Sequence, residues 1–261
     1  MTRHISEVSD EDILSRSRRI LGDDALGRLG NIRVILFGVG GVGSWCAESL
    51  VRSGVRHITI VDSDRVSPGN INRQLMATVE TIGDVKVEAL KRHLLTVAPA
   101  AEIDAVCATF SEETADEFAL DSYDYIIDAI DSLKDKVTLI EVATRTRAKF
   151  FSSMGAALKM DPTRVGVAEF RNVKGCPLAR ALRQRFKKLG RWPSRKFLCV
   201  YSDELLPNLG PAPEITTPES GDPYALTWDA RKAQINGSLM HITALFGLTL
   251  AGLVIQSVYK K

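Results

Sequence analysis

A glycine-rich run directly after a short apolar segment is the strongest chemical signal in the chain. It reads Gly38-Val-Gly40-Gly41-Val-Gly43 and contains the spacing G-x-G-x-x-G. Glycines permit a tight turn, and their missing side chains let a phosphate reach the amides that open the following helix. Asp62 follows the next apolar segment, where a carboxylate would meet a ribose hydroxyl. The pattern predicts a nucleotide site and leaves a nicotinamide-dependent enzyme open.

Charged and amide side chains farther along the sequence distinguish between kinds of nucleotide site. Asp64 supplies a second carboxylate, Lys86 opens the next expected helix, and Asp131 follows a later expected strand. The segment after Asp64 adds the polar residues Asn70, Asn72, Arg73 and Gln74. Attack at the α-phosphate of ATP builds negative charge on phosphate oxygens, which Arg, Lys and a carboxylate-held Mg²⁺ would stabilise. A dinucleotide site has no evident need for Arg73 and Lys86 together, so the set favours ATP.

Strands that alternate with helices must position these residues. Short apolar runs predict strands at 34–37, 57–61, 103–108, 125–128 and 150–154, and periodic segments predict helices at 10–29, 42–53, 85–97 and 133–146. This alternation predicts an α/β fold with a doubly wound, Rossmann-like sheet and helices on both faces. We assign residues 1–158 to this ATP-binding part.

The remaining residues, 159–261, are expected to form a smaller mixed α/β part within one compact domain. Strands are predicted at 165–170 and 197–201, with a basic helix at 178–189 between them. A proline-rich loop is expected at 203–224, followed by a closing apolar helix. The last part, 233–259, contains no charged residue, but its densest apolar stretch has 14 residues, which is typical of a core helix rather than a membrane span. Membrane association through this segment stays an alternative.

Charge is unevenly distributed along the chain. The 261 residues are 45% hydrophobic and 25% charged, which excludes a disordered chain. Ten of the 34 basic residues lie between Arg171 and Lys196, where there is no acidic residue, so the rest carries 24 basic and 32 acidic residues, a balance of −8. We interpret this basic segment as a surface for a polyanion such as RNA. A solvated amphipathic helix is the alternative.

Cysteine usage and the N-terminus indicate the compartment. The four cysteines form no C-x-x-C pair, so no zinc site is expected. A chain of this length does not need a disulfide framework to fold, and the N-terminus does not resemble a signal peptide. A cytoplasmic location is therefore expected.

The residues of the glycine run, with Asp62, Asp64, Asn70-x-Asn72-Arg73-Gln74, Lys86 and Asp131, resemble the ThiF/MoeB/HesA superfamily over about residues 15–154. The resemblance implies an enzyme that adenylates a carboxylate with ATP and Mg²⁺. It implies that Gly41 and Asp62 contact the nucleotide, and that Asp131 holds the metal. It assigns the phosphates to Asn70, Arg73 and Lys86. Arg16 would reach the site of a neighbouring subunit, which implies a homodimer; a solvated surface arginine is the alternative reading.

The second half resembles the tRNA threonylcarbamoyladenosine dehydratase branch of that superfamily. The matching pieces are Met160-Asp-Pro-Thr163, the helix from Pro177 to Arg183, Cys199-Val-Tyr-Ser-x-Glu204 and Gly237-Ser238. The resemblance implies cyclisation of the threonylcarbamoyl group of adenosine 37 in the anticodon loop of tRNA, with loss of water driven by ATP. On the expected basic helix and just beyond it, the residues assigned to tRNA binding are Arg180, Arg183, Arg185, Lys187, Lys188 and Arg191.

One departure from the branch concerns a thiol. Some members have a cysteine just before the Gly-Ser pair, whereas residues 231–237 here contain none and no cysteine follows Cys199. Three alternatives follow: ring closure proceeds directly from the adenylate, Cys199 serves as the nucleophile, or the chemistry differs. A buried structural role for Cys199 is favoured. Two other functions stay open: activation of a ubiquitin-like sulfur-carrier protein, and nicotinamide-dependent oxidoreduction. A monovalent cation and sulfur-relay partners are further open points.

Overall fold

The computed structural model describes residues 9–210 and 236–261, and within these ranges seven strands form one sheet. The strands are β1 (Arg33–Phe37), β2 (His57–Val61), β3 (Glu102–Val106), β4 (Tyr125–Asp128), β5 (Lys149–Ser153), β6 (Val165–Glu169) and β7 (Leu198–Ser202). Their order across the sheet is β3-β2-β1-β4-β5-β7-β6. All neighbouring strands are parallel except β6, which pairs antiparallel with β7 at the edge. The predicted strands and the α/β fold are confirmed.

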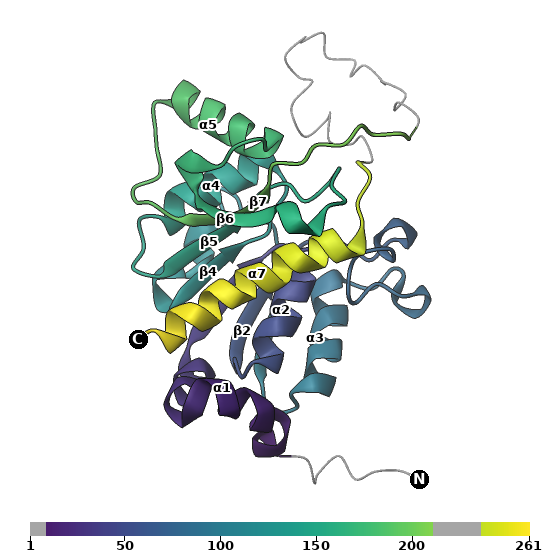
Figure 1. Cartoon of the computed structure of the whole chain (residues 1–261), viewed down its shortest axis with the longest axis vertical. Coiled ribbons are helices and arrows are strands. Elements are labelled where there is room, and N and C mark those ends of the chain that lie inside the picture. The colour runs from purple at the N-terminus through teal and green to yellow at the C-terminus, as the bar shows by residue number, and fades with distance from the viewer. Residues whose placement is uncertain (1–8, 211–235) are drawn as a thin grey trace.

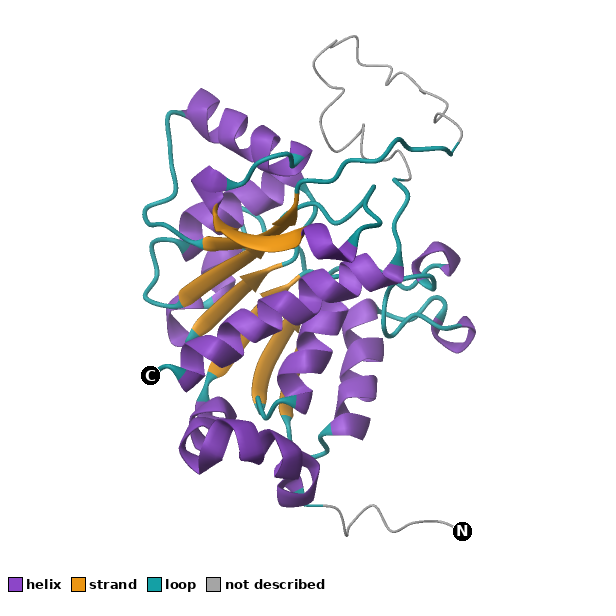
Figure 2. Cartoon of the chain, in the orientation of Figure 1, coloured by secondary structure: helices purple, strands orange, loops and turns teal. Residues whose placement is uncertain are grey.

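Helices cover both faces of this sheet (Figure 2). One layer contains α1 (Asp10–Asn31), α2 (Gly43–Arg52), α3 (Lys86–Val97) and α7 (Met240–Tyr259). The other contains α4 (Leu133–Ala143) and α5 (Pro177–Leu189). Short 3-10 turns occupy the connections: η2 (Pro68–Asn70), η3 (Val79–Thr81), η4 (Ala115–Phe118), η5 (Leu120–Ser122), η6 (Pro162–Arg164) and η7 (Phe170–Asn172).

Strand β1 is the point at which the chain order reverses, because it lies between β2 and β4. In doubly wound sheets, ligands bind outside the carboxyl ends of the strands at such a point. Gly38 follows β1 directly, and Ala129 donates its amide to the carbonyl of Phe37 at 2.8 Å. The glycine-rich run and the segment after β4 therefore meet at the carboxyl edge.

Helix α7 crosses the sheet beside α2 and packs into the core (Figure 1). By length and composition this helix could cross a membrane, but half of its most apolar 18-residue stretch is buried inside the fold. A Cβ at Gly247 would lie 2.3 Å from the carbonyl oxygen of Val42, so the two helices approach as closely as only glycine permits. This packing agrees with the predicted core helix and gives the membrane alternative no support. The greater part of the expected loop 203–224, and residues 233–235 of the apolar segment, lie outside the described residues.

Candidate active site

The glycine-rich loop joins β1 to α2 in a conformation that needs glycine. Gly38 has a φ of +85°, and a Cβ there would lie 2.7 Å from the carbonyl oxygen of Ala129. A Cβ at Gly43 would lie 1.8 Å from the carbonyl oxygen of Gly38. Among the described residues, no side chain caps α2 at Val42, and within its first turn the amide of Ser44 donates to the carbonyl of Gly40 at 3.1 Å. Backbone amides at a helix start, without side chains in front of them, are suited to a phosphate.

Asp62 braces this loop from the end of β2. Its Oδ2 accepts a hydrogen bond from the amide of Val39 at 2.8 Å, and its Oδ1 accepts one from the amide of Asp64 at 2.9 Å. The carboxylate is half-buried beside the loop. Asp62 therefore lies at the carboxyl edge and holds the glycine loop through the amide of Val39, and its contact with a ribose stays a prediction.

Lys86 and Asp64 form an ion pair at the same edge. The Lys86 Nζ lies 2.7 Å from the Asp64 Oδ2, and its side chain is 7% exposed against 67% for Asp64. The amide of Lys86 also donates to the carbonyl of Asp64 at 3.0 Å. Asp84, which is close to Lys86 in the sequence, pairs instead with Arg92. Because the ammonium of Lys86 is buried and its partner Asp64 is exposed, the ammonium is suited to bind a second anion at this edge.

Arg73 sits on a turn that the neighbouring asparagines hold. Asn70 accepts the amide of Ser67 on its Oδ1 at 3.0 Å, and its carbonyl accepts the amide of Arg73 at 3.1 Å. The Arg73 Nη1 donates to the Oδ1 of Asn72 at 2.9 Å. Trp45, on α2, donates its Nε1 to the carbonyl of Arg73 at 3.0 Å. Asn70 and Asn72 are therefore engaged with the protein, and Arg73 is fixed beside the glycine loop.

Gln74 is a buried amide with unused hydrogen-bonding capacity. It is 6% exposed, and its Oε1 has no hydrogen-bond partner among the described residues. Its Nε2 lies 3.7 Å from the position that a Cβ at Gly40 would take. A buried acceptor left unpaired costs about 1–3 kcal/mol. This orphaned oxygen beside the glycine loop therefore fits a ligand that donates a hydrogen bond there.

The segment that carries Asp131 is anchored by a buried ion pair that the sequence did not predict. The Lys136 Nζ lies 2.8 Å from the Asp128 Oδ2, with both side chains fully buried, and donates to the carbonyl of Ile130 at 2.7 Å. The Oγ of Ser152 donates to Asp128 at 2.6 Å. Burial raises the pKa of Asp128, while Lys136 and Ser152 oppose that shift. Asp131 itself is exposed on the loop between β4 and α4.

No group of three or more His, Cys, Asp or Glu residues within 9–210 and 236–261 could hold a metal ion alone. Mg²⁺ commonly takes one or two protein carboxylates together with substrate phosphates and keeps several waters. The exposed carboxylate of Asp131, at the edge where phosphate would bind, fits a metal that arrives with ATP.

Arg16 lies at the opposite edge of the sheet. The Asp10 Oδ2 accepts a hydrogen bond from the Nε of Arg56 at 2.6 Å, and Arg56 directly precedes β2, so α1 begins at the amino edge. The helix also ends there, because β1 starts two residues after Asn31. Arg16 is exposed on α1. Within one chain, Arg16 therefore does not join the other site residues.

Five of the ten basic residues of the segment lie on α5, and one of these five turns toward the protein. Arg180, Arg185, Lys187 and Lys188 are exposed. Arg183 differs from these four residues, because it is half-buried and donates its Nη1 to the carbonyl of Phe170 at 3.2 Å.

Beyond α5 the same segment is partly engaged with the protein. The Arg191 Nε lies 3.2 Å from the Oε1 of Glu141, and Arg195 donates to the carbonyl of Ala143 at 3.2 Å. Trp192 stacks on Phe186 at a centroid distance of 6.2 Å, and the guanidinium of Arg171 lies 5.1 Å from its ring. Arg191 and Arg195 are held by contacts with the protein, and Arg171 lies over the ring of Trp192. Together with the exposed Lys187 and Lys188, they keep this part of the surface basic.

The cysteines differ in burial. Cys199 is fully buried on β7, and burial raises the pKa of its thiol well above the ordinary value. The favoured structural role for Cys199 agrees with this environment. Cys46 and Cys176 are also buried, and Cys107 is exposed after β3. A thiol acts as a nucleophile only as the thiolate, so Cys199 is poorly suited to form a thioester.

Comparisons with known proteins agree with this arrangement. The ThiF family model matches residues 14–260. The tRNA threonylcarbamoyladenosine dehydratase of Bacillus subtilis is 38% identical over 190 residues, 73% of this chain and 74% of the relative. That of Haemophilus influenzae is 31% identical over 248 residues, 93% and 92% of the two chains. The dehydratase 2 of Saccharomyces cerevisiae is 40% identical over 187 residues, 69% of this chain but 42% of the relative.

Solved structures give the same picture. The Escherichia coli tRNA N6-threonylcarbamoyladenosine dehydratase in complex with ATP has a TM-score of 0.80 at 26% identity, covering 96% of both chains. Its complex with AMP has a TM-score of 0.80 at 28% identity, with the same coverage. Together with the match of the family model over nearly the whole length, these similarities establish the family. The chain belongs to the ThiF family.

Proposed function

We propose that the protein is an ATP-dependent tRNA threonylcarbamoyladenosine dehydratase. In this role it adenylates the carboxylate of N6-threonylcarbamoyladenosine at position 37 and closes the ring, releasing AMP and pyrophosphate. The observation that carries the proposal is the meeting of the glycine loop, Lys86 and Arg73 at the carboxyl edge of β1. Relatives that are named as such dehydratases, at 31–40% identity, supply the substrate.

The site residues divide the work of adenylation. The amides at the start of α2 and the side chains of Asn70, Arg73 and Lys86 hold the phosphates, and Asp62 holds the ribose as well as the loop. The substrate carboxylate attacks the α-phosphorus, and the bond to the β-phosphate oxygen breaks. Lys86 and Arg73 then stabilise the charge on the departing pyrophosphate. Mg²⁺, held by Asp131 and the phosphates, would neutralise part of the same charge.

Ring closure follows without a thiol in this proposal. A carboxylate is a poor electrophile, and the acyl-adenylate makes its carbon open to attack. The carbamoyl group lies in the same side chain, so its attack on that carbon is intramolecular and expels AMP. The deep burial of Cys199 supports this direct route.

The test of this function is product analysis. Incubation with ATP, Mg²⁺ and tRNA that carries N6-threonylcarbamoyladenosine should yield AMP and pyrophosphate in equal amounts. Mass spectrometry of the nucleosides should show a product lighter by one water. ADP as the nucleotide product would refute adenylation, and AMP release without the lighter nucleoside would refute the tRNA substrate.

The other candidate functions have weaker support. The molybdopterin-synthase adenylyltransferase of Escherichia coli is 28% identical over 211 residues, below the identity to the dehydratases. Activation of a sulfur carrier, with sulfur-relay partners, therefore ranks second. Oxidoreduction with a nicotinamide is disfavoured, since the ion-paired Lys86 and the fixed Arg73 suit a triphosphate, which such a cofactor lacks. A cytoplasmic enzyme is part of the proposal.

The tRNA is proposed to bind the basic surface formed by Arg180, Arg185, Lys187, Lys188 and Arg191. Helix α5 begins near Gly175, whose Cβ position would lie 2.7 Å from the Cβ of Asp203, and β7 ends at Ser202. Its first turn is therefore at the carboxyl edge. Its last turn lies near α4's end, where Ser194 donates its amide to Thr144 at 3.1 Å. The helix thus extends from the side of the nucleotide site across the layer, a span of about 20 Å for its 13 residues.

Replacing Arg180, Lys187 and Lys188 with alanine should weaken the binding of all tRNAs to a similar degree. Each lost phosphate contact should flatten the salt dependence by about one unit of log–log slope, because fewer counterions are released. Filter binding at several salt concentrations measures both effects. Alanine at Arg52, Lys91 and Arg92, on α2 and α3, removes the same charge from the other layer and is the control. An unchanged affinity and slope in the first variant would leave α5 as a solvated helix.

A homodimer completes the proposed site. Arg16 is at the wrong edge to serve its own chain, so it contributes only if a second copy brings α1 to the nucleotide. Ile20, an apolar side chain four residues after Arg16 on the same helix, is 80% exposed.

A further inference from the structure

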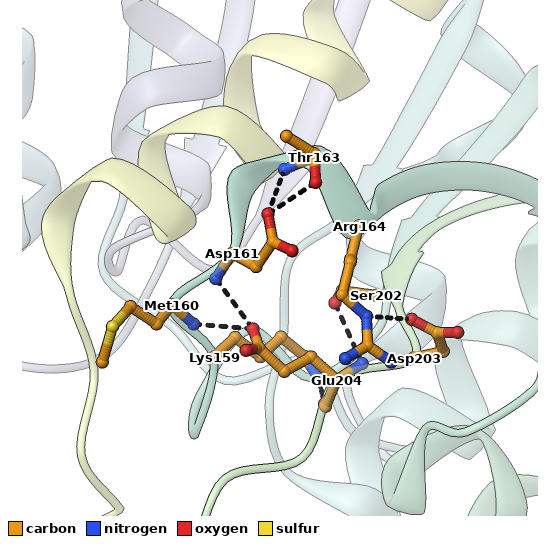
Figure 3. A network of polar contacts seen from close by, with 8 residues as sticks. All are labelled: Lys159, Met160, Asp161, Thr163, Arg164, Ser202, Asp203 and Glu204. Atoms are coloured by element: carbon orange, nitrogen blue, oxygen red, sulfur yellow. Dashed lines mark hydrogen bonds and ion pairs between the residues drawn. The ribbon is translucent and has the colours of Figure 1, made fainter.

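A buried carboxylate behind β7 fixes a turn on the neighbouring chain segment (Figure 3). Glu204 is 7% exposed. Its Oε2 accepts hydrogen bonds from the amides of Met160 at 2.7 Å and Asp161 at 2.9 Å. These two amide bonds hold the pKa of Glu204 below its ordinary value, so it is ionised at neutral pH. The turn around Met160 is thereby tied to the end of the sheet.

The same turn is held at Leu158 and Lys159. Lys159 is 3% exposed and donates its Nζ to the carbonyl of Glu204, while burial lowers the pKa of its ammonium. Leu158 has a φ of +59°, a conformation that L side chains rarely adopt. Its carbonyl accepts the amide of Leu206 at 2.9 Å. Such a conformation persists where surrounding contacts impose it, and here Glu204 and its neighbours supply them.

Residues 158–161 also hold the segment that leads into α7. The amide of Leu158 donates to the carbonyl of Gly237 at 2.8 Å. The Nε2 of His241, in the first turn of α7, donates to the carbonyl of Met160 at 2.9 Å. Two hydrogen bonds therefore join the residues fixed by Glu204 to residues 237–241.

That segment reaches the phosphate-binding residues through Asn72. The Nδ2 of Asn72 donates to the carbonyl of Ser238 at 2.9 Å, while its Oδ1 accepts the Arg73 Nη1. A Cβ at Gly41 would lie 3.1 Å from the Cγ of Arg73 and 3.2 Å from the Oγ1 of Thr243. Arg73 and the first turn of α7 thus both border the glycine loop.

We propose that Glu204 is a positioning residue for Arg73. It fixes the turn at 158–161, and the turn fixes residues 237–241. Asn72, which is anchored on that segment, holds the guanidinium of Arg73 together with the carbonyl of Gly69, which accepts the same Nη1 at 2.8 Å. The inference deepens the proposed function and rests on it for one point, which is that Arg73 binds phosphates that AMP lacks. Loss of Glu204 should therefore weaken the grip on the outer phosphates of ATP and leave the binding of AMP unchanged.

The test compares the affinities of two nucleotides without turnover. Calorimetry with the α,β-methylene analogue of ATP and with AMP is carried out on Glu204→Ala, Asn72→Ala and the double variant. Each single variant should bind the analogue about tenfold more weakly. This is the lower end of the range of losses seen when a contact that orients a binding group is removed. AMP affinity should stay within about twofold, and the double variant should be no weaker than either single variant, because both act through one route.

Matched variants distinguish positioning from a general loss of structure. Glu204→Gln keeps an acceptor for the two amides and should bind the analogue nearly as well as the natural protein. Arg164→Met removes the 2.8 Å pair with Asp203 in the same network and lies off the route, so both affinities should stay unchanged. If Glu204→Ala does not fold, Asn72→Ala still tests the route, since Asn72 is exposed.

Equal weakening of AMP and the analogue, or additive losses in the double variant, would overturn the inference. Failure of the proposed function looks different, since it appears as absence of AMP formation by the natural protein. A natural protein that forms AMP while Glu204→Ala binds both nucleotides normally would refute the positioning role alone.

Discussion

Asp131→Ala is expected to lower the rate of AMP formation by on the order of a hundredfold or more. The carboxylate is exposed on the loop after β4, and Lys136 holds that loop through the carbonyl of Ile130. Removing the carboxylate should leave the fold intact, since the buried pair of Asp128 and Lys136 stays in place. The loss should therefore fall on the charge that develops during pyrophosphate departure.

The measurement is the rate of pyrophosphate release over a range of Mg²⁺ concentrations. The variant should need more Mg²⁺ for half-maximal rate, and its melting temperature should be close to that of the natural protein. Asp121→Ala is the control, because it removes an exposed aspartate from η5, which precedes β4 at the other edge. Near-normal turnover of Asp131→Ala would show that the metal is held elsewhere.

Lys86→Ala should have an effect of similar size, again on the order of a hundredfold or more in rate. Its ammonium is almost fully buried at the edge where the phosphates are expected, and its partner Asp64 is largely exposed. Asp64 can be hydrated once the lysine is gone, so little folding stability should be lost. Asp64→Asn, which leaves the lysine in place, should lose much less activity. Steady-state kinetics of both variants, with thermal melts alongside, check this expectation.

The same variant tests the dimer. In a heterodimer of Lys86→Ala and Arg16→Ala chains, one of the two sites has both groups intact. Such purified heterodimers should recover up to about half of the natural rate, whereas each homodimeric variant stays slow. No recovery would mean that Arg16 is a surface arginine with no part in the site.

The strands could be predicted because a buried parallel strand appears in the sequence as a continuous apolar run. The run at 34–37 and the one at 57–61 coincide with β1 and β2 to within one residue. The order β5-β7-β6, with an antiparallel edge, could not be predicted, since pairing between distant segments leaves no local pattern. The glycine loop was visible because its residue types are dictated by backbone geometry that few other residues allow.

Partnerships between side chains were much less predictable than elements. The sequence assigned Arg183 to tRNA binding with the other basic residues of the helix, but an arginine can bend toward a carbonyl such as that of Phe170, and residue spacing does not reveal this. Asp128 gave a usable signal, because a carboxylate at the end of an apolar strand must find a cation, and Lys136 follows in the next helix. Glu204 gave none apart from the resemblance, since the amides it binds lie far back in the chain.

The close approach of α7 to α2 has a consequence for biosynthesis. The glycine loop is translated early, yet the helix that borders it, with Gly247 against Val42 and Thr243 near Gly41, is translated last among the described elements. A nascent chain folds its earlier segments first, so the apolar flank of α2 must wait for a distant partner. Until α7 has been synthesised, the apolar side of α2 is exposed to solvent and the glycine loop lacks one of its neighbours. A chain released before α7 is complete would therefore leave the apolar flank of α2 exposed to solvent and prone to aggregation.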